Sequence, residues 1–325
     1  MDGFSERRIS IVFAVAIVVS LAVLAGIGLL AEARVGPGGP VGVRPTPRPT
    51  YAPVALIGAG DIASCSDDGD SATAALLAAI DGIVFTTGDN AYPDGAAEDY
   101  AECYEPTWGI ARARTRPVPG NHEYDTGTAD AYRAYFGAQA VPQGTTWYSF
   151  TAGAWLVVML DSECDEIGGC GADSRQIAWL RDELTRTDRS CVMAIWHRPR
   201  FSSGYHGSHA DSAVFWDVLH EAGAEIVVNG HDHDYERFAP QNPAGTADPE
   251  HGIRQFVVGT GGADLRPFED VIANSEVRDA ETHGVLRLTL SDGSYDWEFT
   301  PVAGGSFTDA GRGTCHGPPD AAPSP

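Results

Sequence analysis

Short apolar runs alternate with amphipathic stretches along most of this chain, and each kind predicts a different element. The apolar runs are bounded by Gly, Pro, Asp or Ser, which is typical of β-strands. The last two runs flank a Ser-Asp-Gly-Ser turn and predict a hairpin. We expect strands at Val54–Ile57, Ile83–Thr86, Thr146–Phe150, Trp155–Leu160, Val192–Trp196, Glu225–Val228, Gln255–Val258, Val285–Leu290 and Tyr295–Pro301.

The amphipathic stretches between these runs repeat apolar residues with helical spacing. Ser174 and Asp211 precede two of the stretches and are expected to be N-caps. Early β/α units are followed by strand-rich segments. This order favours a mixed α/β (α+β) fold, in which two sheets pack face to face with helices outside. We expect this domain to span residues 54–303, with helices at Ser71–Ile80, Ala97–Cys103, Thr128–Phe136, Ser174–Arg186 and Asp211–Ala222.

The N-terminal part of the chain has a different pattern. Residues 9–30 form an apolar stretch without a polar face, long enough to span a bilayer as one helix. This length favours a retained transmembrane anchor, while the small residues Ala31 and Ala33 leave a cleaved signal peptide as the alternative. Arg7 and Arg8 are expected to keep residues 1–8 in the cytoplasm. We therefore expect the domain on the extracytoplasmic face of the membrane, or secreted if the segment is cleaved.

Two further segments lack the periodicity of folded elements. Residues 31–53 are rich in Gly and Pro and predict an extended linker, and residues 304–325 predict a flexible tail. The chain has six cysteines, which permit up to three disulfides in an oxidising compartment; free buried cysteines are the alternative. The spacing allows a Cys164–Cys170 loop and a Cys65–Cys103 bridge, and Cys315 is placed to pin the start of the tail.

The charge of the chain narrows its partners. A formal net charge of −24 at pH 7 and a pI near 4.5 disfavour nucleic acid, which is bound mainly through clustered cations. The cysteines form no Cys-x-x-Cys motif, which disfavours a thiolate zinc site.

Four glycines are each followed directly by a residue that can bind a metal. Three of these glycines close predicted strands, and the fourth follows a Pro-Val-Pro sequence. We expect the glycines to turn the backbone with positive φ and to permit close approach of other groups. The following side chains then stand at the carboxyl ends of strands, where α/β sheets bind ligands. The pairs are Gly60-Asp61, Gly88-Asp89, Gly120-Asn121 and Gly230-His231.

Histidines extend this set. His197 ends a predicted strand, and His231 and His233 would face the same side of an extended segment. Each residue alone is an ordinary turn or surface residue, but together the carboxylates, amide and imidazoles suit a first-row transition metal. The candidates outnumber the ligands of one tetrahedral ion and fit two ions that share a bridging carboxylate. They are Asp61, Asp89, Tyr92, Asn121, His197, His231 and His233.

The sequence around these residues resembles the metallophosphoesterase, or calcineurin-like phosphoesterase, superfamily. Its blocks occur in family order at Gly60–Ala63, Gly88–Tyr92, Gly120–Glu123, His197 and Gly230–Arg237. Tyr92 and the Tyr-Glu-Arg that ends the last block are similar to the purple acid phosphatase branch. One position departs from the branch, because Ala63 stands where glycine is usual.

The resemblance implies a four-layer αββα sandwich with a dinuclear centre. One ion, expected to be Fe³⁺, would be held by Asp61, Asp89, Tyr92 and His233. A second, divalent ion of Fe, Zn or Mn would be held by Asp89, Asn121, His197 and His231, with Asp89 bridging the two.

The expected chemistry is attack by a metal-bound hydroxide on a small-molecule phosphate monoester. The family implies that His122 protonates or stabilises the leaving alkoxide. Asn121 would also contact substrate, and Arg198, His206 and His209 either join it there or belong to a solvated loop. A phosphodiesterase or nucleotide hydrolase on the same centre and a non-catalytic phosphate-binding surface protein are alternatives. The loop at residues 259–262 is similar to a dinucleotide loop, but no helix follows it, so we expect it to line the metal cleft.

Overall fold

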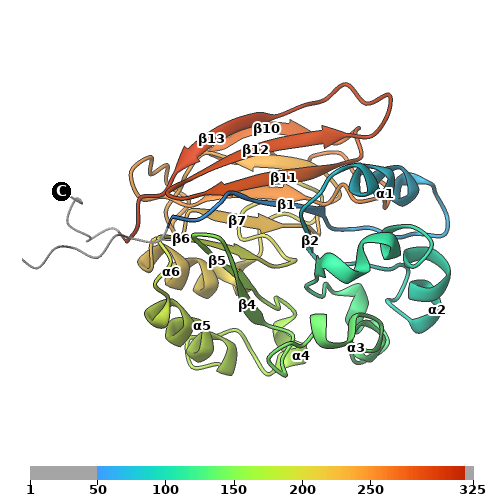
Figure 1. Ribbon diagram of the computed structural model, residues 1–325, viewed down its shortest axis with the longest axis horizontal. Coiled ribbons are helices and arrows are strands. Elements are labelled where there is room, and N and C mark those ends of the chain that lie inside the picture. Colours follow the sequence, from blue (N-terminus) through green and yellow to red (C-terminus); the bar gives the residue numbers. More distant parts are fainter. Residues whose placement is uncertain (1–49, 319–325) are drawn as a thin grey trace, which may run out of the picture. The chain divides into compact units, whose positions relative to one another are not determined.

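The computed structural model describes residues 50–318 of the chain (Figure 1). The segments predicted at 1–8 and 9–30, and most of the linker predicted at 31–53, lie outside these residues. Across residues 50–318, no helix combines the length and the apolar character needed to cross a membrane. The anchor and its alternative, a cleaved signal, therefore stay predictions.

Two mixed β-sheets form the centre of the fold. The first has the strand order β13-β12-β11-β1-β2-β3, and the second has the order β10-β8-β9-β7-β6-β5-β4. In the first sheet, β1 lies between a parallel partner, β2, and an antiparallel partner, β11. The bounds in that sheet are β1 Val54–Ala59, β2 Ile83–Thr86, β3 Thr115–Arg116, β11 Gly284–Ser291, β12 Ser294–Pro301 and β13 Ala310–Thr314.

The second sheet has a parallel centre, in which β5, β6, β7 and β9 run in one direction. On one side of this centre β4 is antiparallel to β5, and on the other β8 is antiparallel to β9 and β10 is antiparallel to β8. The bounds are β4 Tyr148–Ala152, β5 Trp155–Met159, β6 Cys191–Ile195, β7 Ile226–Asn229, β8 Tyr235–Phe238, β9 Arg254–Val258 and β10 Ser275–Asp279.

Side chains of the central strands alternate between two hydrophobic layers. In β5, Trp155, Val157 and Met159 belong to the core shared with the first sheet. Leu156 and Val158 belong to the layer shared with the helices of the second sheet. This alternation is the reason that β5 reads as an unbroken apolar run, because both of its faces are buried.

Helices cover the outer face of each sheet. Figure 1 shows α5 (Arg175–Arg186) and α6 (Ala213–Glu221) beside the second sheet, and α1 (Gly69–Ala79) contacts β11 of the first. The predicted four-layer sandwich of two mixed sheets between helices is therefore confirmed. Shorter helices connect the strands at α2 (Ala97–Asp99), which continues as a π-helical turn at Tyr100–Tyr104, α3 (Asp130–Phe136) and α4 (Cys164–Ile167).

All nine predicted strands and all five predicted helices are present, with ends within two residues of the prediction where one element is formed. Ser174 caps α5 as predicted, because its side chain accepts a hydrogen bond from Ile177 N. The predicted cap at Asp211 is wrong. Asp211 lies inside a 3₁₀ turn, Ala210–Ser212, that precedes α6.

The flexible tail predicted from residue 304 is wrong where β13 forms. This strand pairs with β12, so the folded domain continues past residue 303 to at least Thr314. Its sequence, Ala-Gly-Arg-Gly-Thr, has no apolar side chain larger than alanine to reveal it. A Cβ added at Gly311 or Gly313 would lie 2.2 Å from the ring of Trp297 or Tyr295. The strand is therefore positioned by the aromatic rings of β12.

All six cysteines are paired in the structure. The predicted Cys65–Cys103 and Cys164–Cys170 bridges are present. The third bridge joins Cys191, in β6 of the second sheet, to Cys315, directly after β13 of the first. It pins the chain after the last strand, as predicted for Cys315.

Candidate metal centre

The candidate ligands lie on loops that follow the carboxyl ends of five strands. Asp61 and Asp89 follow β1 and β2, and Asn121 follows the short β3 by five residues. In the second sheet, His197 follows β6 and His231 follows β7. These loops meet at one edge of the sandwich, which brings residues far apart in sequence together.

The glycines before the ligands act mainly by leaving space. A Cβ at Gly120 would lie 2.2 Å from Asp89 Oδ1, and one at Gly230 would lie 2.5 Å from Asp61 Oδ2. Of the four glycines, only Gly88 has a positive φ, of 94°. The expectation that each glycine itself turns the backbone is therefore wrong for the other three.

Positive φ instead falls on three of the ligand residues. It is 57° at Asp61, 49° at Asp89 and 73° at His231. Such angles are uncommon for residues other than glycine and cluster at functional sites. Each glycine thus makes room for a side chain from a neighbouring loop. After Gly60, Gly88 and Gly230 the ligand residue takes a positive φ, whereas Asn121 after Gly120 has a φ of −70°.

One group of donors surrounds the hydroxyl of Tyr92. This oxygen lies 3.1 Å from Asp61 Oδ1, 3.2 Å from Asp89 Oδ2 and 3.1 Å from His233 Nε2. His233 Nδ1 lies 2.8 Å from the carbonyl oxygen of Asp264 and donates to it. The nitrogen that faces the group is therefore Nε2 with its lone pair.

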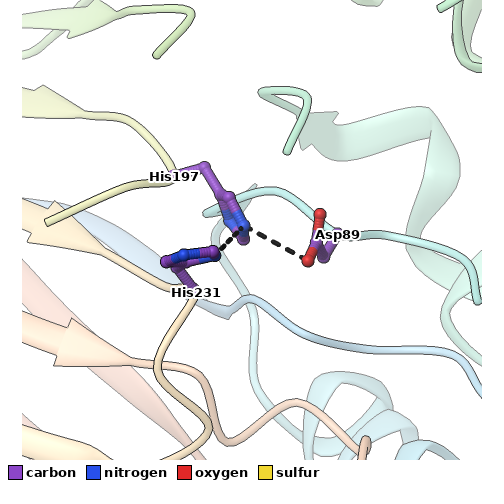
Figure 2. A group of neighbouring side chains, drawn as sticks. All are labelled: Asp89, His197 and His231. Atoms are coloured by element: carbon purple, nitrogen blue, oxygen red, sulfur yellow. Dashed lines mark hydrogen bonds and ion pairs between the residues drawn. The ribbon is translucent and has the colours of Figure 1, made fainter. Parts of the chain in front are cut away.

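A second group surrounds His197, as Figure 2 shows for three of its members. His197 Nε2 lies 3.2 Å from Asp89 Oδ2, 3.1 Å from His231 Nδ1 and 3.2 Å from Asn121 Oδ1. His197 Nδ1 donates to Thr87 O at 2.8 Å, so Nε2 is the ring nitrogen that faces the group. Asp89 Oδ2 thus stands 3.2 Å from the central atom of each group.

These groups have the donor chemistry of a metal site. Oxygen and nitrogen lone pairs converge on the same space, which is unfavourable unless a proton or a cation lies between them. Burial opposes a charge on His197, yet Asp89 and then Asp61 raise its pKa to about 10. The protein alone therefore holds a proton where these donors meet. A transition-metal cation would satisfy the same lone pairs, so the residues fit it.

The electrostatics of the individual donors agree with this reading. Burial, followed by the neighbouring Arg266, lowers the pKa of His233 to about 4, which keeps its ring neutral. Burial, His197 and Arg198 also lower the pKa of His231. Burial raises the pKa of Tyr92, with Asp61 and Asp89 adding to the shift, so its phenolate needs a cation in order to form.

Glu123 holds two of the ligand loops through hydrogen bonds to their backbone, a role that the sequence did not reveal. Its carboxylate is fully buried and accepts hydrogen bonds from Asp89 N at 3.0 Å and Gly120 N at 2.6 Å. It also accepts from Asn90 N and from the Tyr100 hydroxyl. The only signal was its place in the family block at residues 120–123.

Ala63, where the branch usually has glycine, is accommodated without strain. Its φ is not positive, and it forms a parallel bridge with Ala91. Its carbonyl accepts from Tyr92 N at 2.8 Å. The alanine therefore takes part in the backbone pairing that positions Tyr92.

The two histidines of the last block reach the centre from a turn rather than from extended backbone. His231 has positive φ, Asp234 N donates to Asp232 O at 2.8 Å, and β8 begins only at Tyr235. The extended conformation predicted for this block is therefore wrong. The turn lets His231 join one donor group while His233 joins the other.

His122 stands at the rim of the centre. Its backbone N–H donates to Asp89 Oδ1 at 3.0 Å, which places the residue beside the shared carboxylate. Its Nδ1 donates to the carbonyl oxygen of Pro93, so Nε2 is the nitrogen that remains available. The side chain is 29% exposed, so a bound molecule can reach it.

The loop after His197 packs against the centre. Arg198 Nη1 lies 3.3 Å from His231 Nε2, and Arg198 Nε donates to Glu163 Oε1 at 2.9 Å. The rings of His206 and His209 lie 4.3 Å and 4.8 Å from the ring of His231, centroid to centroid. All three residues therefore contact a candidate ligand, which argues against an independent solvated loop.

Arg266 is a further residue of this rim that sequence reasoning missed. Its Nη1 lies 2.6 Å from His206 Nε2, and its backbone N–H donates to His233 O. The glycine-rich loop at 259–262 lies just before it. A Cβ at Gly259 would lie 2.8 Å from Asp61 Oδ2, so this loop packs directly against the centre, as expected.

Comparison with known proteins places this geometry in a family. Residues 55–235 match the model of the calcineurin-like phosphoesterase family. The chain belongs to this family. The matched range contains all seven candidate ligands and the strands β1 to β7, while the strands from β9 onward, which complete the two sheets, lie after it.

Similar curated proteins lie in the acid phosphatase branches. Purple acid phosphatase 15 of Arabidopsis thaliana is 32% identical over 158 residues, which cover 42% of this chain and 29% of that protein. Acid phosphatase A of Cryphonectria parasitica is 26% identical over 201 residues, covering 53% and 40%. The chain thus spans less than half the length of these relatives. The resemblance to the purple acid phosphatase branch is confirmed.

A solved structure shares the fold. The purple acid phosphatase from yellow lupin (Lupinus luteus) seeds superposes with a TM-score of 0.65 at 21% identity. The match covers 80% of this chain and 53% of the lupin chain.

Proposed function

We propose that this chain hydrolyses phosphate monoesters at a centre of two metal ions. The observation that carries the proposal is the position of Asp89 Oδ2, 3.2 Å from both Tyr92 Oη and His197 Nε2, where one carboxylate can serve two ions. Asp61, Tyr92 and His233 would complete the first site, expected to hold Fe³⁺. Asn121, His197 and His231 would complete the second, for a divalent ion of Fe, Zn or Mn.

When bound, the two ions would lower the pKa of coordinated water toward neutrality and offset the charge of the phosphoryl oxygens. That positive charge matters because the protein carries a formal charge of −24 and would otherwise repel phosphate. Arg198, next to His231, is placed to orient a phosphoryl oxygen. We also propose that Asn121, His206 and His209 contact this end of the substrate.

His122 is proposed to deliver a proton to the leaving oxygen. The Pro93 carbonyl fixes the proton on Nδ1, so Nε2 faces the centre and carries the transferable proton when the ring is charged. Loss of such a group typically lowers the rate by about 10²- to 10⁴-fold.

The test combines metal analysis with two classes of ester. The metal-replete protein should hydrolyse 4-nitrophenyl phosphate faster than bis(4-nitrophenyl) phosphate, whereas the reverse order would favour a phosphodiesterase. His122→Ala should keep its metals but lose alkyl phosphate turnover more strongly than nitrophenyl phosphate turnover, since nitrophenolate leaves without protonation. Full alkyl phosphate turnover in a metal-replete His122→Ala protein would remove the proposed role. A metal-replete wild-type protein that is inactive on all phosphate esters would favour a binding protein.

We further propose that the domain works in an extracytoplasmic, oxidising compartment. The three disulfides of the structure support this location, because such bonds persist mainly outside the reducing cytosol. The apolar segment at residues 9–30 supports it as well.

A further inference from the structure

A cavity of about 620 Å³ opens beside His122. At one end it is lined by Tyr92, His122 and His233, which belong to the candidate centre. The Cys65–Cys103 disulfide forms part of its wall. Its volume suits a small-molecule ligand.

The position of His122 indicates what this cavity would hold. Under the proposed function, on which this inference rests, the proton donor must stand next to the leaving oxygen. His122 lines this cavity and is absent from the lining of the roughly 370 Å³ cavity that begins at Asn121. The alcohol part of the ester therefore belongs in the larger cavity.

The cavity is acidic. Its lining contains four carboxylates and one guanidinium, that of Arg266, which gives a formal charge of −3 with histidine neutral. Arg266 is held at the metal end by His206 and His233. The carboxylates belong to Asp67, Asp99, Glu102 and Asp264.

The fold fixes two of these carboxylates at the wall. Asp67 stands two residues after Cys65, and Glu102 directly precedes Cys103, so the disulfide anchors both segments. Asp99 is used more fully inside the protein, because its Oδ2 accepts from Asp94 N and Ala96 N, whereas Asp67 accepts one hydrogen bond, from Gly69 N to Oδ1 at 3.3 Å. Asp67, Glu102 and Asp264 are therefore the carboxylates best placed to act on a bound molecule.

We propose that this cavity selects phosphate monoesters whose alcohol part carries a positive charge, such as an alkylammonium group. Carboxylates at the wall attract such a group and repel a second anionic group on the substrate. The smaller cavity on the other side of the centre offers no alternative for a polyanion. It is lined by Asp125, Asp165, Glu166 and Asp211, and its one guanidinium, Arg198, is paired with Glu163.

The first test compares substrates of equal length on the metal-replete wild-type protein. They are 2-aminoethyl phosphate, 2-hydroxyethyl phosphate and phosphoglycolate, whose alcohol parts are cationic, neutral and anionic. We expect kcat/KM for the cationic ester to exceed that for the anionic ester by at least about tenfold at low ionic strength. The ratio should shrink in about 0.5 M salt, because exposed charges are screened. A ratio of one or less would overturn the proposal.

The second test removes the charges with near-isosteric substitutions. The triple variant Asp67→Asn/Glu102→Gln/Asp264→Asn should lower the cationic-to-anionic ratio at least about threefold. The matched control removes three exposed carboxylates outside the cavity lining and should keep the wild-type ratio and nitrophenyl phosphate turnover. It is Asp81→Asn/Asp217→Asn/Asp292→Asn.

The outcomes separate this inference from the proposed function. If wild-type protein hydrolyses nitrophenyl phosphate but does not discriminate between the charged esters, only the selectivity is wrong. If the control variant lowers the ratio as much as the cavity variant, overall charge is the cause and the cavity has no special role. If the metal-replete protein hydrolyses none of the esters, the proposed function is wrong, and this inference is wrong with it.

Discussion

Three residues of the metal centre hold backbone angles that side chains other than glycine rarely adopt. Asp61, Asp89 and His231 have positive φ, and the glycine before each one is packed against another part of the site. The strain is therefore placed on the residues whose side chains must converge. Each of these loops is constrained by the positive φ of its ligand residue and by the lack of space for a Cβ at the glycine before it. Substitution of these glycines is therefore expected to disturb the site.

Gly120, which precedes Asn121 and has no positive φ, allows the constraint of space to be measured by itself. A Cβ there would lie 2.2 Å from Asp89 Oδ1 and 2.5 Å from Asp89 N, so Gly120→Ala must displace the shared carboxylate and its backbone. We expect a loss of about 1–3 kcal/mol in unfolding free energy and loss of bound metal. Gly171→Ala is the matched control, because Gly171 has no neighbouring atom within 4 Å and no positive φ. Metal analysis and thermal unfolding of both variants would check this, and wild-type metal content in Gly120→Ala would contradict it.

Tyr92 has a spectroscopic consequence. Burial and the two nearby aspartates raise its pKa, so a phenolate here requires a bound cation. If that cation is Fe³⁺, the protein should absorb visible light, and Tyr92→Phe should lose the band while keeping the fold. Tyr205→Phe removes the phenol beside Arg266, whose guanidinium carbon lies 5.5 Å from the Tyr205 ring centroid, and should keep the band. A colourless wild-type protein that contains Fe³⁺ would exclude Tyr92 as a ligand.

The sequence predicts residues of this centre when they follow a strand directly. A preceding glycine marks Asp61, Asp89 and His231 in the sequence, and a preceding predicted strand marks His197. Glu123 and Arg266 had no such local signal, since their partners come from distant parts of the chain. The carboxylate of Glu123 faces inward to backbone N–H groups of two loops, which only the folded structure can reveal.

At the scale of elements, the same distinction separates predicted from missed strands. Strands buried on both faces, such as β5 and β6, are continuous apolar runs in the sequence, so the hydrophobic pattern predicts them. The missed strands are β3, with two residues, the polar β8, and the edge strands β10 and β13. In β8, Glu236 and Arg237 are buried because Ser203 and Asp309 satisfy them. A pattern of alternating polar and apolar residues cannot reveal polar side chains that are buried with hydrogen-bond partners from distant parts of the chain.

The disulfide after β13 should contribute more stability than the one beside α4. Cys191 and Cys315 are 124 residues apart, and Cys164 and Cys170 are 6 apart. The chain-entropy relation gives about 5 kcal/mol for the long loop and about 2 kcal/mol for the short one. We therefore expect Cys191→Ser/Cys315→Ser to lower the melting temperature further than Cys164→Ser/Cys170→Ser. Equal losses in thermal unfolding would contradict this order.

At the scale of the whole molecule, the net charge repels a phosphate ester, whereas the fold gathers the groups that attract it. The protein carries a formal charge of −24, and both cavities beside the centre are acidic. Attraction for phosphate is thus concentrated at the proposed ions and two arginines, Arg198 and Arg266. The αββα architecture was predictable through the family blocks, whereas the sign of charge around the cavities depended on which loops the fold brought together.

The pairing of β1 with β11 has a consequence for how the centre comes into being. All seven candidate ligands precede residue 234, yet β1, which leads to Asp61, pairs along its length with a strand that begins at Gly284. A nascent chain therefore carries every ligand long before the sheet that aligns them is closed. We expect a chain ended after Phe238 to bind no metal, although it contains the whole family match. Metal binding by that fragment would show that the motif assembles without its sheet; otherwise the centre is among the last parts of the molecule to mature.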